Sequence, residues 1–91
     1  MEKVAVIILN YKTKELTLKC IESVKKSDNK NYKLIVVDNH SEDGLVEDFK
    51  DRKDFILIKN SRNSGYSGGN NLGIRRALKE EAGYILILNP D

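Results

Sequence analysis

The stretch YKLIVVDNHSEDG, residues 32–44, decides the fold class because an apolar run leads directly into a polar segment. Runs that are rich in Val and Ile, and that do not alternate with polar residues, are typical of strands covered on both faces, as in a parallel sheet. The polar residues from Asp38 onwards then follow the carboxyl end of a parallel strand. Ligands of open α/β sheets bind at this end of the strands.

Three more apolar runs are spread along the chain and are separated by segments with helical features. They are VAVIIL (4–9), FILI (55–58) and YILIL (84–88). Between the first two strands, apolar residues recur every three or four positions over residues 13–25, which is the spacing of an amphipathic helix. Strands and helices are therefore predicted to alternate along the whole chain.

Capping residues predict where the helices begin and end. Thr13 and Ser41 are placed to cap the first two helices, and the third is expected to begin near Gly69 and to stop at Gly83. The order β-α-β-α-β-α-β predicts an α/β fold in which an open, Rossmann-like parallel sheet lies in a three-layer arrangement. We expect one domain over residues 1–91, with four strands in the order 3-2-1-4 and three helices.

Composition and charge exclude several classes of protein. Hydrophobic residues make up 40% of the chain and charged residues 33%, which argues against disorder. The net charge of +2 gives no indication of nucleic-acid binding. A single cysteine, Cys20, fits a reducing compartment, and neither a signal peptide nor an apolar stretch of membrane-spanning length is recognisable. These features predict a cytoplasmic protein.

Polar residues that could contact a ligand follow the predicted strands. Asp38 is placed to accept hydrogen bonds from a ribose or a base. It could instead only cap the next helix, but Ser41 is available for that cap. Asn89 and Asp91, after the last strand, offer oxygen ligands that suit Mg²⁺ or Mn²⁺ bridging a diphosphate.

The glycine-rich stretch NSGYSGGNNLG, residues 63–73, matches neither the P-loop nor the dinucleotide-binding fingerprint. It is predicted to be a loop that enters a helix, where free backbone N–H groups favour an anion. Tyr66, within it, could cover a nucleotide or pack on the helix. His40 is expected to be exposed to solvent, because no nucleophile in the sequence is evidently paired with it.

Four ordered motifs resemble those of family 2 glycosyltransferases, the inverting enzymes with a GT-A fold. They are VAVIILNYKTKE, LIVVDNHSEDG, NSGYSGGNNLGI and LILNPD, and together they cover essentially the whole chain. Within the family, the last two are similar to those of rhamnosyltransferase-like and cell-wall sugar transferases. The resemblance implies that Tyr11 stacks on the base, that Asp38 bonds the base, and that NPD occupies the D-x-D position, in which Asn89 replaces the first aspartate.

The resemblance also implies a UDP- or dTDP-sugar donor with Mg²⁺ or Mn²⁺. Asn70 lies where many relatives have arginine, and the family's acceptor site and catalytic base follow the position of Asp91. No catalytic residue is therefore expected in this chain, which is predicted to be a truncated donor-binding segment, inactive alone. The residues expected to contact the nucleotide are Asn10, Tyr11, Asp38, Asn39, Gly65, Gly68, Gly69, Asn70 and Asn71, and those expected to bind the metal are Asn89 and Asp91.

In a complete enzyme of this kind, the sugar would pass to a hydroxyl of a glycan or lipid-linked acceptor in glycan or cell-surface polysaccharide synthesis. The alternative is a non-catalytic nucleotide-binding or interaction module of the same fold. The predicted strand 84–88 contains no charge or proline and would lie at the margin of the sheet, so it also predicts self-association.

Overall fold

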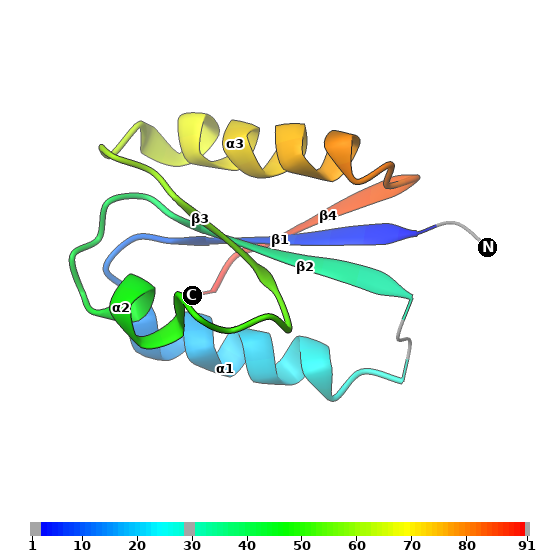
Figure 1. The fold of residues 1–91 in the computed structure, drawn as a ribbon, viewed down its shortest axis with the longest axis horizontal. Coiled ribbons are helices and arrows are strands. Elements are labelled where there is room, and N and C mark those ends of the chain that lie inside the picture. The colour runs from blue at the N-terminus through cyan, green and yellow to red at the C-terminus, as the bar shows by residue number, and fades with distance from the viewer. Residues whose placement is uncertain (1–2, 29–30, 91) are drawn as a thin grey trace.

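The fold was established from a computed structural model, which describes residues 3–28 and 31–90. Strands and helices alternate along the chain, as the apolar runs predict (Figure 1). The elements are β1 (Val4–Asn10), α1 (Lys14–Lys25), β2 (Tyr32–Asp38), α2 (Leu45–Phe49), β3 (Ile56–Lys59), α3 (Gly65–Lys79) and β4 (Tyr84–Leu88).

The four strands form one parallel sheet in the order β3-β2-β1-β4, which confirms the predicted topology. Strand β1 lies in the centre, with Val4 opposite both Tyr32 of β2 and Tyr84 of β4. Strands β3 and β4 form the two edges. The carboxyl ends of β1 and β2 are in register, so Asn10 lies opposite Asp38.

Helices cover both faces of the sheet, and each face has its own apolar core. Figure 1 shows α1 and α2 on one face and α3 on the other. Because successive residues of a strand point to opposite faces, even-numbered residues of β1 and β2 pack towards α1 and odd-numbered ones towards α3. The buried residues of the first core are Val6, Ile8, Ile21, Leu34, Val36, Leu45 and Phe55, and those of the second are Ala5, Ile7, Leu9, Ile35, Val37 and Ala77.

Three predicted helix boundaries are wrong, and one of them is the end of the third helix, which was expected at Gly83 but lies at Lys79. Helix α2 is preceded by Gly44 at its N-cap, and the Ser41 hydroxyl instead donates to the carbonyl oxygen of Asn10 at 3.1 Å. Helix α3 begins at Gly65, four positions before Gly69, so most of the predicted glycine loop is helical. Low helix propensity made that stretch resemble a loop, but packing against the sheet outweighs propensity here.

Close contact with the sheet explains two of the helical glycines. A Cβ atom at Gly69 would lie 2.5 Å from Leu9 Cδ1, and one at Gly73 would lie 2.6 Å from Ile7 Cγ2. Both distances are shorter than real Cβ contacts, so the absent side chains let α3 approach β1 closely. Over residues 3–28 and 31–90, no helix is both long enough and apolar enough to cross a membrane.

Candidate functional site

The candidate site lies where β1 and β2 end, and the buried side chain of Asn10 is its centre. The Nδ2 atom of Asn10 lies within hydrogen-bond distance of Asp38 Oδ1 (2.8 Å) and Ser41 Oγ (3.0 Å). Its Oδ1 atom accepts from the hydroxyl of Thr17 on α1 at 2.7 Å. Asn10 and Thr17 have no exposed surface, so this network fixes the end of β1 relative to β2 and α1.

Asp38 has capacity left for a further partner. Its Oδ1 accepts from Asn10, and its Oδ2 accepts from the backbone N–H of Ser41 at 3.3 Å. An ionised carboxylate has about four acceptor positions, so two bonds leave room for others. The residue is only 3% exposed, yet it lines a hollow of about 220 Å³. Asp38 is therefore an acceptor held in place at the wall of a cavity.

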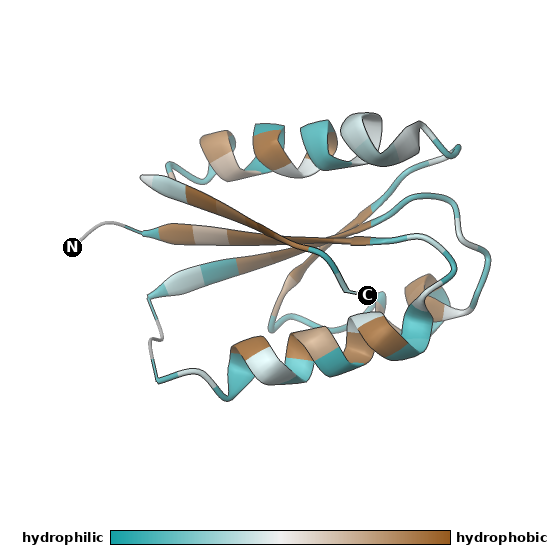
Figure 2. Cartoon of the chain, turned by 180° about the vertical axis from the view of Figure 1, so that it is seen from behind, coloured by the Kyte–Doolittle hydropathy of each residue, from teal (hydrophilic) through white to brown (hydrophobic). Residues whose placement is uncertain are grey.

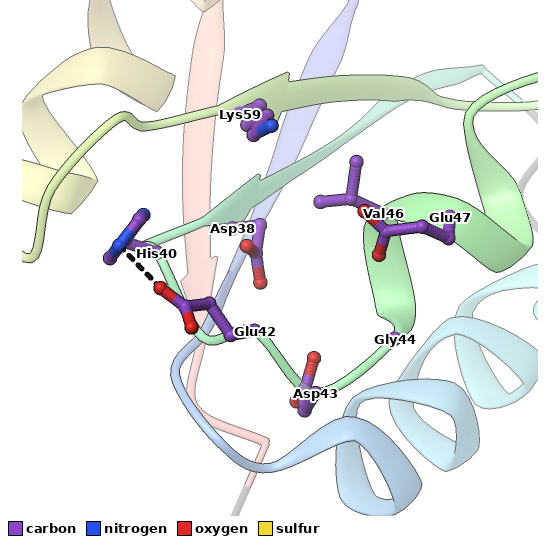
Figure 3. Close-up of a pocket in the computed structure, with 8 residues that line it drawn as sticks. All are labelled: Asp38, His40, Glu42, Asp43, Gly44, Val46, Glu47 and Lys59. Atoms are coloured by element: carbon purple, nitrogen blue, oxygen red, sulfur yellow. Dashed lines mark ion pairs between the residues drawn. The ribbon is translucent and has the colours of Figure 1, made fainter.

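The hollow at Asp38 is lined by charged side chains from β2, β3 and the segment that leads into α2 (Figure 3). Lys59 lies opposite Asp38 in the register of β2 and β3, and both face the hollow. Within the described part of the chain, Lys59 makes no ion pair and thus offers a donor beside the acceptor Asp38. The sequence prediction did not include Lys59, since only strand register brings it next to Asp38. The lining residues are Asp38, His40, Glu42, Asp43, Gly44, Val46, Glu47 and Lys59.

A second hollow of about 420 Å³ adjoins the first and contains Tyr11. His40 and Glu42 line both hollows, and their side chains pair at 2.7 Å (Figure 3). Tyr11 is 40% exposed, so its ring is accessible, and the Lys12 ammonium lies 5.3 Å from the ring centroid. As expected, His40 is exposed.

Three non-glycine residues beside these hollows have left-handed backbone conformations. The φ angles are 57° at Lys12, 61° at His40 and 55° at Glu42. Such angles are energetically costly for residues with a Cβ, and they are enriched at ligand-binding sites. At Lys12, the backbone N–H donates to the Ser41 hydroxyl at 3.0 Å, which holds this conformation in place.

Asn39 lies near the site but faces away from the hollow at Asp38. It is 2% exposed, and its Nδ2 donates to Asn63 Oδ1 at 2.8 Å and to the carbonyl oxygen of Gly65 at 3.1 Å. Its Oδ1 accepts from Asn60 Nδ2 at 2.8 Å. These bonds give Asn39 a structural role: it ties the end of β2 to the segment that enters α3.

The other predicted nucleotide contacts lie on the first two turns of α3. Gly65 has a φ of 78°, and Gly68 would bring a Cβ within 2.7 Å of the Ser64 side chain. Asn71 is exposed, whereas Asn70 is only 4% exposed. Neither the amide nitrogen nor the amide oxygen of Asn70 has a hydrogen-bond partner among the described residues. A buried amide without partners is costly, yet both of its polar atoms are covered and Asn70 lines neither hollow, so its contact with a nucleotide stays a prediction.

Of the two predicted metal ligands, Asn89 is exposed after β4, and Asp91 lies outside the described residues. Between Lys3 and Pro90, leaving out residues 29–30, no three His, Cys, Asp or Glu side chains are grouped to hold a metal. Oxygen ligands from one or two side chains nevertheless suit Mg²⁺ or Mn²⁺ when phosphate oxygens supply other positions. The donor set therefore fits a metal that binds together with a diphosphate.

Outside the hollow at Asp38, ion pairs and burial shift the pKa values of several side chains. The carboxylate of Asp48 on α2 bonds the Lys14 ammonium on α1 and raises the pKa of Lys14. The Arg52 guanidinium, and then Lys25, hold the pKa of Asp54 well below its usual range. Burial raises the pKa of the Cys20 thiol. These pairs connect helices and loops and do not contact the hollow at Asp38.

Residues 5–91 match the sequence family described as glycosyl transferase family 2. Over 92 residues, the chain is 36% identical to the low-salt glycan biosynthesis hexosyltransferase Agl10 of Haloferax volcanii, covering 100% of this chain and 28% of that protein. Over 96 residues, it is 28% identical to a teichoic acid poly(glycerol phosphate) polymerase of Staphylococcus epidermidis, covering 100% of this chain and 13% of that protein. The chain thus spans less than a third of the length of either relative.

Solved structures show the same fold. One is S. aureus TarS 1-349 in complex with UDP-GlcNAc, with a TM-score of 0.81 and 23% identity over 98% of this chain and 26% of that one. Another is the mannosyltransferase PcManGT from Pyrobaculum calidifontis in complex with GDP-Man and Mn²⁺, with a TM-score of 0.71 and 21% identity over 84% of this chain and 24% of that one. At these identities, the likeness concerns the arrangement of strands and helices.

Proposed function

Because the chain belongs to glycosyl transferase family 2, we propose that the end of its sheet at Asp38 binds the nucleotide of a nucleoside-diphosphate sugar. The observation that carries this proposal is the geometry of Asp38: a buried carboxylate, fixed by Asn10 and Ser41, lines a hollow at the carboxyl end of a parallel sheet. A ring N–H of a nucleobase is a donor that such an acceptor can bind.

The neighbouring side chains suit the other parts of a nucleotide. Tyr11 offers an exposed ring on which a base can stack, and Lys59 offers a donor for a carbonyl oxygen of the base or for an anionic oxygen. Asn70, without a partner among the described residues, is assigned to the sugar-diphosphate. The complexes of the two similar structures with UDP-GlcNAc and GDP-Man support a nucleotide sugar as the ligand class.

We assign the metal, Mg²⁺ or Mn²⁺, to Asn89 and Asp91, whose oxygen atoms would hold it together with the diphosphate. When bound, the metal supplies charge neutralisation for the nucleoside diphosphate that leaves. The similar mannosyltransferase structure, which is in complex with Mn²⁺, supports a divalent metal. Side chains of this chain then hold the base at Asp38 and orient the donor.

The reaction that we propose for the whole enzyme is transfer with inversion to a hydroxyl group of a glycan or lipid-linked acceptor. UDP or dTDP is the proposed nucleotide, and a rhamnosyltransferase-like role in cell-surface polysaccharide synthesis is the proposed context. General-base catalysis needs a carboxylate next to the acceptor hydroxyl, and we assign this group to a part of the enzyme beyond Asp91. The 91-residue chain is accordingly expected to bind the donor without transferring the sugar.

Binding can be tested by two-dimensional NMR titration of the chain with UDP, dTDP, GDP and NAD in the presence of Mn²⁺ or, to avoid paramagnetic broadening, Mg²⁺. We expect UDP or dTDP to shift the amides that follow β1 and β2. Asp38→Asn should weaken this binding about tenfold or more, because a charge-assisted hydrogen bond is lost. Asp51→Asn, at an exposed position, is the matched control. Preferential binding of NAD, or equal binding by the Asp38 variant, would contradict the proposal.

A further inference from the structure

Lys59 faces the hollow at Asp38 from the neighbouring strand. Strands β2 and β3 are parallel, and Asp38 lies opposite Lys59 in their register. The residues two positions earlier, Val36 and Leu57, both pack in the core on the α1 face, and residues two apart in a strand point to the same face. Figure 3 shows Asp38 and Lys59 at the ends of these adjacent strands. Strand pairing therefore sets an ammonium donor and a buried carboxylate acceptor at the wall of one hollow.

The charges around this hollow decide what kind of oxygen Lys59 can bind. Figure 2 shows that the strands, hydrophobic along most of their length, give way to hydrophilic segments at their carboxyl ends. Lys59 is the only lysine or arginine among the described residues that line the hollow, whereas carboxylates line it besides the one that pairs with His40. They belong to Asp38, Asp43 and Glu47. These carboxylates would repel a phosphate oxygen at Lys59, since charges interact strongly outside bulk water. A carbonyl oxygen, which carries no net charge, avoids that repulsion.

The order of the strands decides which carbonyl oxygen of a base faces Lys59. In the proposed function, on which this inference rests, a base N–H bonds Asp38 on β2 and the diphosphate lies near Asn89, after β4. In the order β3-β2-β1-β4, Lys59 lies on the side of Asp38 that is remote from β4. In uracil and thymine, the N3–H lies between O2, which is next to the ring nitrogen that carries the ribose, and O4, which is remote from it. With the ribose towards β4, O4 therefore faces Lys59.

We propose that Lys59 donates to O4 of the base while Asp38 accepts from its N3–H, so that the two residues together select uracil or thymine and reject cytosine. Cytosine carries an amino group in place of O4 and has no hydrogen on N3. Its amino group would therefore meet the ammonium of Lys59, donor against donor, and its N3 would meet the carboxylate of Asp38, acceptor against acceptor. A site that hydrogen-bonds one ligand rejects an analogue that leaves its polar groups unpaired. Lys59 is thus a specificity-determining residue.

The ratio of the affinities for UDP and CDP tests this role of Lys59. Lys59→Met removes the ammonium and keeps an unbranched side chain. In NMR titrations with Mg²⁺, it should weaken binding of UDP and dTDP about tenfold, because a charge-assisted hydrogen bond is lost. Binding of CDP, which gains nothing from Lys59, should change by less than about twofold. Lys53→Met is the matched control and should leave all three affinities unchanged, since Lys53 is exposed before β3 and does not line the hollow. Equal weakening of UDP and CDP by Lys59→Met would overturn the proposal and indicate a contact with the phosphates.

Thio-substituted nucleotides test which oxygen Lys59 contacts, and they do not depend on measurable binding of CDP. Sulfur is a weaker hydrogen-bond acceptor than oxygen. We expect 4-thio-UDP to bind the unchanged chain about three- to tenfold more weakly than UDP, and to bind the Lys59→Met variant as well as UDP does. The analogue 2-thio-UDP should show no penalty that depends on Lys59. A penalty that Lys59→Met removes for 2-thio-UDP instead of 4-thio-UDP, or for neither of them, would overturn the contact with O4.

The same titrations distinguish a failure of this role from a failure of the proposed function. If the chain binds no nucleotide, both are wrong. If UDP binds and Asp38→Asn weakens its binding, but Lys59→Met lowers the affinities for UDP and CDP equally, the donor site stands and only the role of Lys59 is wrong.

Discussion

Glycine and asparagine residues suggested a ligand site both in the first three turns of α3 and in the network around Asn10, but the two regions use these residues differently. In the Asn10 network, buried polar groups satisfy one another and leave an acceptor at Asp38. On α3, the glycines Gly69 and Gly73 let the helix pack closely on the sheet, and Asn70 has no described partner. The comparison teaches that an unusual composition indicates close packing as readily as binding, and that unused hydrogen-bonding capacity is the better guide to a candidate ligand contact.

The largest effect is expected from Asn10→Ala. The substitution removes the nearer of two partners of the Thr17 hydroxyl and one of the two partners of Asp38 inside the protein, and buried groups that lose partners cost about 1–3 kcal/mol each. We expect the free energy of unfolding, measured by urea denaturation at a fixed protein concentration, to fall by about 2–4 kcal/mol. Asn71→Ala, at an exposed position of α3, is the control and should change it by less than about 0.5 kcal/mol. Similar losses in both variants would show that the network is not special.

A smaller loss is expected from Gly73→Ala, which tests whether the helical glycines serve packing. The added methyl group would meet Ile7, which has no exposed surface, and overpacking costs about 1–3 kcal/mol. Higher helix propensity returns up to about 1 kcal/mol, so we expect a net loss of about 1–2 kcal/mol in the same urea measurement. Affinity for UDP, measured by NMR titration, should be unchanged. A loss of binding with unchanged stability would instead place Gly73 at the ligand.

The comparison also shows which parts of the fold could be read from the sequence. Sheet order and helix placement followed from four apolar runs and the handedness of crossovers, since these depend on patterns that the sequence displays directly. The start of α3 was missed because helix propensity describes an isolated segment, whereas Gly69 and Gly73 are helical through contacts with Leu9 and Ile7. Contacts of that kind depend on the tertiary structure.

The candidate site could be predicted from the sequence to a similar degree. Asp38 and Asn10 were both predicted to contact the nucleotide, because strand ends meet at one edge of a parallel sheet. Asp38 lines the hollow there, whereas Asn10 is fully buried and bonds to other side chains of the protein. Lys59 was missed because its place beside Asp38 depends on the pairing register of β2 and β3. Asn39 follows Asp38 directly and looked equivalent to it, but it faces α3, where all its bonds are internal to the chain. Neither register nor the facing of a single polar residue is encoded by residue type alone.

Asn70→Ala should have the opposite sign to Asn10→Ala. It removes a buried amide that has no partner among the described residues, and alanine is the better helix former. Because a small cavity opposes these gains, we expect the chain to be stabilised by about 0.5–1 kcal/mol in thermal and urea denaturation. Binding of a UDP-sugar should weaken at the same time, as is common where a site is kept at a cost in stability. Destabilisation by more than about 1 kcal/mol would mean that Asn70 has an internal partner.

The smallest effect is expected from Gly68→Ala, because two contributions of similar size oppose each other. Gly68 is only partly buried, so alanine gains up to about 1 kcal/mol of helix propensity. Its Cβ, however, would lie 2.7 Å from the Cβ and Oγ of Ser64, the exposed N-cap residue, which would have to shift. We expect a net change of less than about 0.5 kcal/mol in the free energy of unfolding, measured by urea denaturation.

Combining Gly68→Ala with Ser64→Gly removes the clash, and glycine at an N-cap costs only a few tenths of a kcal/mol. The double variant should therefore recover most of the propensity gain, and a double-mutant cycle should give a favourable coupling of about 0.5–1 kcal/mol. If the two substitutions are simply additive, the close contact with Ser64 does not restrict position 68, and the glycine there would need another explanation, such as direct contact with the ligand.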